Sequence, residues 1–504
     1  KFLDYNLKDT YLIEQMENQT ALLELVATVA YGAGVNFSDA FGTVAIWESI
    51  LYRRLTSKNM MPKIKYSPGG RLLDLLGGYV KTPVPGMYKW IVSFDLNSLY
   101  PHLMLQYNMS PETYNPEKRE EIGIEDILDG RFYNKDPDYA VAPNGAYFRK
   151  DKQGIIPSII DEYYAERKIL KGREIELEKK AEVEKDPIAK KALEKQITQL
   201  FNGQMRIKIA MNSLYGATAN RYFLYYISAM AEAITFGGQT SIQFIEKELN
   251  LYLNKVMKTK TVDYVAYSDT DSVYLNFEPL INKLFTEEEQ KDKDKIEKFL
   301  DKLCASEIET VIDNAYEKLA TQVGAYKNAM KMKREKINDK AILVAKKRYI
   351  LNTLNSEGVH YTIPKISVTG LESVISSTPE ICRRKLAESF SILMNKSEED
   401  VREFVDKFKT EFDSLEPEEI GKTSGTDDIE KFHGTGNNLY GKGCPIHVRG
   451  SLIYNEHLKK MGLENKYEKI NSGDKVKFVY LRLPNPVHEN VISFPNILPD
   501  EFDL

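Results

Sequence analysis

The stretch "VAYSDTDSVYL", residues 265–275, places two aspartates, Asp269 and Asp271, between two apolar runs. The flanking runs are rich in β-branched and aromatic residues, which favour strands, and residues 268–271 favour a turn. An isolated Asp-x-Asp is more often an ordinary polar turn than a metal site. Two carboxylates on a stiff hairpin can also bind Mg²⁺, because the strands fix their positions. The hairpin alone leaves both interpretations open.

Composition narrows the class of protein. The chain has 504 residues, 42% hydrophobic and 28% charged, which is typical of a globular protein with several domains or subdomains. No apolar run is long enough to span a membrane. Three widely spaced cysteines, Cys304, Cys382 and Cys444, form no metal motif and no disulfide framework, so we expect a cytoplasmic location. The net charge of −5 argues only weakly against a nucleic-acid partner, because phosphate contacts are local.

The remaining chain divides by pattern. Residues 10–60 and the Lys/Glu-rich region from about 376 have helical patterns, and residues 283–300 are most simply a solvated helical insert. Loops and short strands are expected from 420 to the end. The first residues, "KFLDYNLKDT", are no signal peptide and lack an initiator Met, so we expect a fragment of a longer protein.

A third aspartate, Asp95, ends the apolar run in "KWIVSFDLNSLYP", residues 89–101. Taken alone, Asp95 is more simply a helix N-cap. Its neighbours favour another role: the backbone N–H groups of Ser98 and Leu99, just past a strand end, suit phosphate oxygens. Tyr100 would then place a rigid ring beside whatever carries those phosphates.

Two long helices are expected next. Residues 158–184 are charged and helical, and Asp186-Pro187 predicts the N-cap and first residue of a second helix that reaches about residue 213. So short a connection predicts an antiparallel pair.

These helices carry cations at informative spacings. Arg167 and Lys171 lie four apart on the first, where a solvated charge stripe also explains most lysines. On the second, Lys208, Asn212 and Tyr215 share one face, and Lys208 lies among apolar residues, where a merely solubilising charge is less expected.

This set of groups fits one chemistry. Two divalent ions held by aspartates can activate an attacking hydroxyl and neutralise the phosphates of a triphosphate. Lys and Arg can clamp the triphosphate and stabilise charge in the transition state. The sequence contains neither a nucleophile elbow nor a Walker loop.

Several motifs resemble those of B-family DNA polymerases. "DLNSLYP" (95–101), "KIAMNSLYG" (208–216) and "YSDTDS" (267–272) resemble the three polymerase motifs in the family's order, and "KKRY" (346–349) resembles the element that holds the primer. "GLESVISSTP" (370–379) and "CPIHVRGSLIYN" (444–455) are most similar to the replicative polymerases of T-even-type bacteriophages. The resemblance implies an α+β fold: a right-handed polymerase core with an antiparallel palm sheet, two-helix fingers and a mainly helical thumb.

The resemblance also implies a function and its ligands. The function is template-directed DNA synthesis, adding dNMP from dNTP to a primer 3′-OH by two-metal phosphoryl transfer in replication. The cofactor would be two Mg²⁺ ions, with Mn²⁺ as a substitute. The partners would be primer–template DNA, dNTPs and a sliding clamp that binds a C-terminal tail absent here, with no membrane, in the cytoplasm of a bacterial host.

Site residues carry over from the motifs. Asp95, Asp271 and the Leu96 carbonyl would ligate the metal ions, with Asp269 as an auxiliary catalytic carboxylate. The groups expected to hold the triphosphate are Ser98, Leu99, Arg167, Lys171, Lys208 and Asn212. Tyr100 would lie under the deoxyribose, and Tyr215 and Gly216 against the nascent base pair. Residues expected at the primer end are Lys346, Lys347, Arg348 and Tyr349, and those expected on the duplex are Lys365, His447 and Arg449. Glu335 matches a family carboxylate near the active site.

The implied domains follow the family. They are an exonuclease remnant (1–24), a segment of the N-terminal domain (25–64), palm (65–152 and 221–360), fingers (153–220) and a truncated thumb (361–504).

Three departures from the family pattern stand out. Leu75 occupies a position where the family often has Tyr in a template contact. Lys442 is shifted by one residue from the position of a thumb lysine in the phage pattern. Tyr5 and Asp9 resemble the third exonuclease motif without its two upstream partners, so no proofreading is expected from this chain.

Two rival functions remain. A metal-dependent nuclease explains the paired aspartates but leaves the Lys208 face without a role. A non-catalytic DNA-binding relic of a polymerase is disfavoured because all three aspartates are present.

Overall fold

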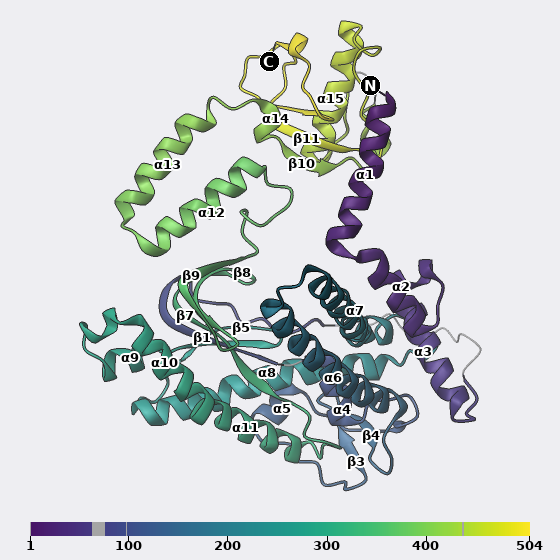
Figure 1. Ribbon diagram of the computed structural model, residues 1–504, viewed down its shortest axis with the longest axis vertical. Coiled ribbons are helices and arrows are strands. Elements are labelled where there is room, and N and C mark those ends of the chain that lie inside the picture. The colour runs from purple at the N-terminus through teal and green to yellow at the C-terminus, as the bar shows by residue number, and fades with distance from the viewer. Residues whose placement is uncertain (1, 63–75, 97, 436–437, 504) are drawn as a thin grey trace. The chain divides into compact units, whose positions relative to one another are not determined.

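The computed structural model describes residues 2–62, 76–96, 98–435 and 438–503 (Figure 1). The chain forms two compact units, one of Lys1–Thr82 with Val92–Ile337 and the other of Pro83–Ile91 with Asn338–Leu504. In the described part of the chain, no helix is long and apolar enough to cross a membrane.

The first unit begins with helices, as expected for residues 10–60. They are α1 (Phe2–Thr20), α2 (Leu22–Ala33), the short η1 (Phe37–Phe41) and α3 (Thr43–Ser57). The apolar side chains of α3 recur three to five residues apart and are buried, which is why this amphipathic segment is helical.

The largest sheet has the strand order β5-β6-β1-β7-β8-β9. Its strands are β1 (Gly86–Leu96), β5 (Val265–Asp269), β6 (Ser272–Asn276), β7 (Met332–Ala345), β8 (Arg348–Ser356) and β9 (Val359–Thr369). β5 and β6 pair antiparallel with Asp269 opposite Ser272, so Thr270 and Asp271 alone form the tip. The hairpin expected at 265–275 is therefore confirmed, with a tighter turn than residues 268–271.

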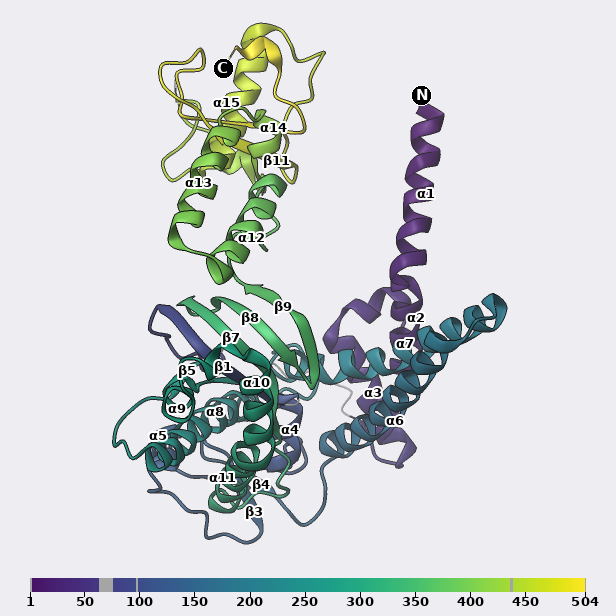
Figure 2. The same ribbon diagram turned by 60° about the vertical axis from the view of Figure 1, so that its left-hand side comes forward.

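Helix α8 (Ser228–Met257) packs against β5 and β6, and α4 (Leu99–Tyr107) and α11 (Glu309–Gln322) pack on α8 (Figures 1 and 2). Two glycines of α8 permit the approach of α4. A Cβ built on Gly237 would lie 3.2 Å from the Leu103 side chain, and one on Gly238 would lie 3.2 Å from Cε1 of Tyr100. Both distances are shorter than ordinary contacts, so the missing side chains bring the two helices together.

A small antiparallel sheet follows α4. Its order is β2-β4-β3, and its strands are β2 (Tyr114–Arg119), β3 (Tyr139–Val141) and β4 (Ala146–Arg149), with α5 (Ile124–Leu128) between β2 and β3.

The two long helices are α6 (Ile155–Val183) and α7 (Pro187–Thr218), which pack along each other in both views (Figures 1 and 2). The Asp186 carboxylate accepts hydrogen bonds from the N–H groups of Ile188 and Ala189, so the predicted N-cap is confirmed. α7 continues five residues beyond the predicted end.

The segment 283–300 is helical but only partly solvated. It spans parts of α9 (Glu278–Leu284) and α10 (Lys293–Leu303) with η2 (Glu289–Lys291) between them, and η3 (Cys304–Ile308) connects α10 to α11. Ile296 and Leu300 are fully buried, so the expectation of a solvated insert was wrong. These two apolar residues lie four apart in a charged sequence and give α10 one buried face.

The second unit contains the Lys/Glu-rich helices α12 (Glu380–Asn395) and α13 (Glu398–Phe412), as expected from residue 376. Beyond them come α14 (Pro417–Ile420), η4 (Ile429–Phe432), α15 (Ile446–Met461), η5 (Asp500–Phe502) and the antiparallel sheet of β10 (Lys422–Gly425), β11 (Lys475–Tyr480) and β12 (Val491–Phe494).

The expectation of only loops and short strands after residue 420 missed α15. This helix packs its buried Val448, Leu452 and Leu458 over the sheet. Glycine is unfavourable in a helix interior, but a Cβ at Gly450 would lie 2.5 Å from Ser493 Oγ. The glycine therefore allows α15 to lie directly on β12.

Candidate active site

The end of β1 and the tip of the β5–β6 hairpin are joined directly. The N–H of Leu96 donates to the Asp271 carbonyl oxygen at 2.9 Å, so the residue after Asp95 is bonded to the hairpin tip. All three aspartates of the predicted site are partly exposed. The Asp269 carboxylate accepts hydrogen bonds from the hydroxyls of Thr270 (3.1 Å) and Tyr267 (3.3 Å). The fold therefore gathers partly solvated carboxylates at one end of neighbouring strands.

A short segment, residues 77–81, lies along the hairpin and was not singled out from the sequence as a support. The N–H of Thr270 donates to the Tyr79 carbonyl at 2.8 Å, and the N–H of Lys81 donates to the Ser268 carbonyl at 3.0 Å. The Lys81 ammonium donates to Asp263 (2.6 Å) and to the Val265 carbonyl (2.7 Å). This segment thus fixes β5 from its outer side.

Ser98 occupies the N-cap of α4, so the alternative of Asp95 as the cap is wrong; Asp95 lies in β1. Ser98 adopts the left-handed conformation with φ +50°, which is rare for residues other than glycine. Its carbonyl lies 3.0 Å from Nδ1 of His102, whose ring meets the Tyr164 ring of α6 edge-on at 5.0 Å. His102 therefore ties the turn before α4 to α6.

Tyr100 connects three distant segments. Its ring centroid lies 4.6 Å from that of Tyr215 on α7, and its ring rests on Gly238 of α8. Burial, with smaller contributions from Tyr215 and Asp271, raises the pKa of Tyr100 to about 12. The hydroxyl is therefore protonated at neutral pH and lies within electrostatic reach of the hairpin tip.

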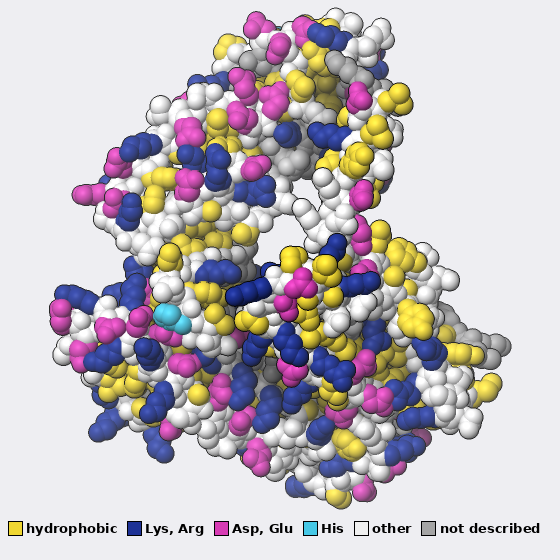
Figure 3. Space-filling model, viewed as in Figure 1, with side chains coloured by type: hydrophobic (Ala, Val, Ile, Leu, Met, Phe, Trp, Pro, Cys, Tyr) yellow, Lys and Arg dark blue, Asp and Glu magenta, His cyan; other side chains and the backbone are white. Residues whose placement is uncertain are grey.

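The polar face of α7 lies beside α6. Nε of Arg167 donates to Gln204 at 3.2 Å, and Gln204 is one helical turn before Lys208. Lys171, Lys208, Asn212 and Gly216 are exposed, and Tyr215 is half-buried. In Figure 3, basic side chains are numerous around α6 and α7 and are interspersed with acidic ones. The negative net charge of the chain therefore does not exclude a locally basic surface.

The residues expected at the primer end belong to the second unit. Lys346 and Lys347 form the exposed turn between β7 and β8, with Lys347 at φ +59°. Arg348 forms a 2.6 Å ion pair with Glu372, and Tyr349 pairs with Thr369 across β8 and β9.

Two further predicted residues lie in the large sheet. The Lys365 ammonium lies 6.0 Å from the Tyr361 ring centre on β9. Glu335, on the part of β7 in the first unit, accepts from the Ser93 hydroxyl at 3.2 Å and pairs with Lys336 at 3.0 Å.

His447 and Arg449 lie in the first turn of α15. The Arg449 guanidinium lies 5.5 Å from the Tyr440 ring centre and donates to Asn490. Burial lowers the pKa of His447, whose ring packs near Phe478. Both side chains therefore have partners within the second unit.

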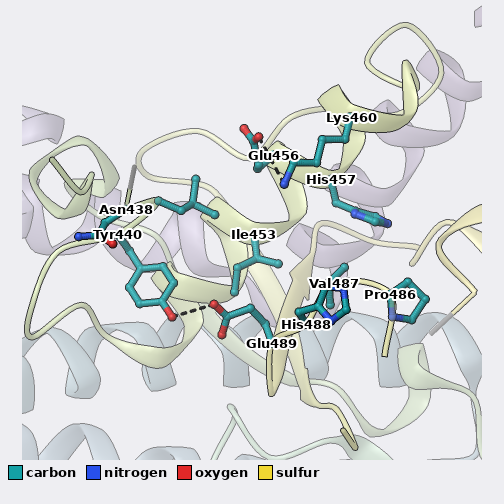
Figure 4. A pocket seen from close by; sticks show the side chains of 11 residues that line it. Asn438, Tyr440, Ile453, Glu456, His457, Lys460, Pro486, Val487, His488 and Glu489 are labelled. Carbon is teal, nitrogen blue, oxygen red and sulfur yellow. Dashed lines mark hydrogen bonds and ion pairs between the residues drawn. The ribbon is translucent and has the colours of Figure 1, made fainter. Parts of the chain in front are cut away.

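A cavity of about 460 Å³ opens beside the C-terminal half of α15 (Figure 4). Tyr440 and Glu489 form one wall, joined by a 2.8 Å hydrogen bond, and His457 and Lys460 of α15 form another.

In the described ranges, no group of three or more His, Cys, Asp or Glu side chains is close enough to hold a metal ion. The predicted metal site has a smaller donor set, Asp95 and Asp271 with the Leu96 carbonyl. These are hard oxygen donors of the kind that Mg²⁺ prefers, and the Leu96–Asp271 bond holds their strands together. The residues therefore fit the ion. Leu75 lies outside the described residues.

A family model described as DNA polymerase family B matches residues 42–319, more than half of the chain. The chain belongs to DNA polymerase family B, which confirms the resemblance drawn from its motifs. It is 30% identical to the "DNA-directed DNA polymerase" of Enterobacteria phage T4 and 29% identical to that of Escherichia phage RB69, over 98% of this chain and 59% of each relative. A "DNA polymerase" of Desulfurococcus sp. (strain Tok) is 26% identical over 85% of this chain and 44% of that protein. The chain thus spans about three-fifths of the length of the two phage relatives.

Proposed function

We propose that this chain carries out template-directed DNA synthesis, adding dNMP from dNTP to a primer 3′-OH, as the polymerase core of a replicative phage-type enzyme. The observation that carries the proposal is the convergence of three motifs that are far apart in the sequence. Leu96 is hydrogen-bonded to Asp271 at 2.9 Å, and the Tyr100 and Tyr215 rings are 4.6 Å apart. Family membership and the phage relatives support the same activity.

Asp95, Asp271 and the Leu96 carbonyl would hold two Mg²⁺ ions. Bound Mg²⁺ would make the primer hydroxyl more acidic and neutralise charge on the triphosphate. Asp269 would act as an auxiliary carboxylate. Its hydrogen bonds to Tyr267 and Thr270 help to fix its position at the hairpin.

The triphosphate would lie between the start of α4 and the exposed face of α7. Lys208 and Asn212 present a cation and an amide from successive turns of α7, and Arg167 reaches the same region from α6 through its contact with Gln204. Lys171 would add a positive charge at the edge of the triphosphate region. Charge-assisted hydrogen bonds of this kind strengthen as negative charge grows on the phosphates.

The backbone N–H groups of Ser98 and Leu99 would complete this cradle. They lie at the N-terminus of α4. The first N–H groups of a helix have no hydrogen-bond partner within the helix, and they can bind an anion. Ser98, in the left-handed conformation, is the N-cap residue of α4 and Leu99 is its first helical residue.

Tyr100 would support the deoxyribose and exclude a 2′-hydroxyl. Its ring has little room to retreat, because Tyr215 lies beside it and α8 lies against it at Gly238. Tyr215 and Gly216 would lie against the nascent base pair, where a residue without a side chain leaves space.

The DNA would also contact the second unit. Lys346, Lys347, Arg348 and Tyr349 would hold the primer end, where the two lysines are cations on an exposed turn and so suit phosphates. Lys365, His447 and Arg449 would contact the duplex. A sliding clamp is a further partner by this proposal. DNA synthesis would take place in the cytoplasm of a bacterial host.

This proposal divides the chain as the family is divided. It assigns the palm to 65–152 and 221–360, the fingers to 153–220 and the thumb to 361–504. Residues 1–24 and 25–64 would be an exonuclease remnant and an N-terminal segment.

Extension of a labelled primer on a template tests the function. We expect stepwise, template-matched elongation with Mg²⁺ and none after chelation, and Asp271→Asn should be inactive under both conditions. Shortening of the DNA without any elongation would favour the metal-dependent nuclease. Tight DNA binding with neither reaction would favour the non-catalytic relic.

A further inference from the structure

The helices α2 and α3 pack against α7, with Gly32 of α2 beside Arg206 and Thr43 of α3 beside Gly216, on either side of the stretch that carries Lys208, Asn212 and Tyr215. On a helix of about 3.6 residues per turn, those three residues share one face. Arg206, Ala210, Ser213 and Ala217 lie on roughly the opposite face. Ala210 and Ala217 are buried, whereas Lys208 and Asn212 are exposed. The α2–α3 pair therefore holds α7 from behind its predicted nucleotide face.

Trp47 of α3 makes a direct hydrogen bond to α7. Its indole N–H donates to the Ala210 carbonyl at 2.9 Å, and its side chain is fully buried. Its ring is 6.5 Å from that of Tyr163 on α6. Ala210 lies midway between Lys208 and Asn212 in the sequence, so a shift at this carbonyl would move both side chains. A buried hydrogen bond has a preferred direction as well as a preferred distance, which suits this role.

Polar contacts surround this link. Arg54 of α3 forms a two-pronged ion pair with Glu162 of α6, and Arg206 of α7 pairs with Glu166 of α6 at 2.8 Å. Past the end of α7, Glu48 of α3 accepts from the N–H of Leu224 at 2.8 Å. Two-pronged Arg–carboxylate pairs fix orientation as well as distance. The three helices are therefore tied together on both sides of Ala210.

We propose that Trp47 is a positioning residue for nucleotide use: through its bond to Ala210 it sets where Lys208 and Asn212 meet the triphosphate. The inference rests on the proposed function and assigns a positioning role to the segment before residue 58. Trp47 itself touches no substrate in this scheme. Its effect is expected on nucleotide affinity, because the contacts that it positions are those to the triphosphate.

Trp47→Phe tests this inference, because phenylalanine keeps an aromatic ring and removes the N–H donor. Ser213→Ala is the matched control. The Ser213 hydroxyl donates to the same Ala210 carbonyl at 2.9 Å, but from within α7, so its loss leaves the link to α3 intact. Single-nucleotide incorporation at saturating primer–template gives KM and kcat for each variant, and a binding titration gives the Kd for DNA.

We expect Trp47→Phe to raise the KM for dNTP about three- to tenfold, the range for one buried hydrogen bond, with kcat and the DNA Kd within about twofold. Ser213→Ala should leave all three within about twofold of wild type. Equal KM values for the two variants would overturn the inference. So would parallel losses in KM, kcat and DNA affinity, which would mark Trp47 as a core residue only.

Hydrogen exchange separates this inference from the proposed function. The amides of residues 206–218 should exchange faster in Trp47→Phe than in Ser213→Ala, whether or not the chain incorporates nucleotide. Faster exchange in a chain that never extends a primer would refute the function and leave the link between α3 and α7 standing. Unchanged exchange in a chain that does extend primers, with KM unchanged, would refute the positioning role alone.

Discussion

Truncation of Tyr100 to alanine should open the nucleotide site to ribonucleotides. The ring is held between Tyr215, with centroids 4.6 Å apart, and the backbone of α8 at Gly238. A colliding 2′-hydroxyl therefore has to break the contact between the two rings before Tyr100 can move. Rejection by collision disappears when the obstructing group is removed.

The structure gives a lower bound for the size of the effect. An aromatic pair of this kind contributes about 0.5–1.5 kcal/mol, and displacing the ring forfeits it. Discrimination of about 1.4 kcal/mol corresponds to a tenfold ratio. We expect Tyr100→Ala to raise the ribonucleotide share of kcat/KM by more than about twofold, the ratio that corresponds to the lower value of about 0.5 kcal/mol, and by about tenfold if the whole pair is lost. Deoxyribonucleotide use should also fall, because the ring would support the sugar as well.

The assay compares kcat/KM for one ribonucleotide and its deoxyribonucleotide on the same primed template. Tyr100→Phe is the matched control. The hydroxyl of Tyr100, with a pKa of about 12, is neutral at assay pH, so its removal should leave the ratio within about twofold. A Tyr100→Ala ratio that also stays within about twofold of wild type would refute the reasoning.

Three other outcomes are expected. Asp271→Asn should lower kcat at least about a thousandfold, which corresponds to several kcal/mol of lost transition-state stabilisation. The DNA affinity and the circular dichroism spectrum should be unchanged. Retention of a tenth of the activity would contradict the metal role. Lys208→Ala should lower kcat/KM for dNTP about ten- to a hundredfold, the value of a charge-assisted phosphate contact, and leave the DNA Kd within about twofold. Lys168→Ala on α6 is its control, and equal losses in DNA binding would mark Lys208 as a general DNA-binding cation. The free energy of unfolding should fall as pH rises from about 10 to about 12. Tyr79 and Tyr100 have pKa values of about 12 in the folded state and near 10 in the unfolded state. The unfolded state therefore releases their protons first, which favours unfolding in this range. Urea unfolding across that range measures it, and a flat profile would contradict the burial of these hydroxyls.

Elements with strong local signals could be predicted from the sequence. The hairpin at 265–275 is set by its apolar runs, and the start of α7 by Asp186-Pro187. α15 was missed, and the close packing on β12 that Gly450 allows depends on a partner strand that the sequence does not identify. Asp is a common N-cap residue, so Asp95 was a reasonable alternative. The N-cap of α4 is instead the left-handed Ser98, three residues later.

The candidate site was found through motifs, and its supports were not. Residues 77–81 and Trp47 act across more than 150 residues of chain, and no period or spacing reveals such contacts. One signal was available: the chain has only two tryptophans, and one lies in the amphipathic segment that became α3. A residue so costly to leave exposed is a natural candidate for a buried link, although its partner cannot be read from the sequence.

The glycine of α8 behind Tyr100 offers a way to tune the site without touching it. A methyl group added at Gly238 would lie 3.2 Å from Cε1 of Tyr100 and 3.3 Å from Cδ2 of Leu99, so both would have to give by a few tenths of an ångström. Because α8 lies against one side of the ring, that movement carries the ring away from α8. Sugar selectivity would then depend on the bulk of one residue of α8, a helix that supplies none of the proposed nucleotide contacts. Gly238→Ala would shift the Tyr100 ring and so change sugar selectivity by a smaller amount than Tyr100→Ala, which removes the ring.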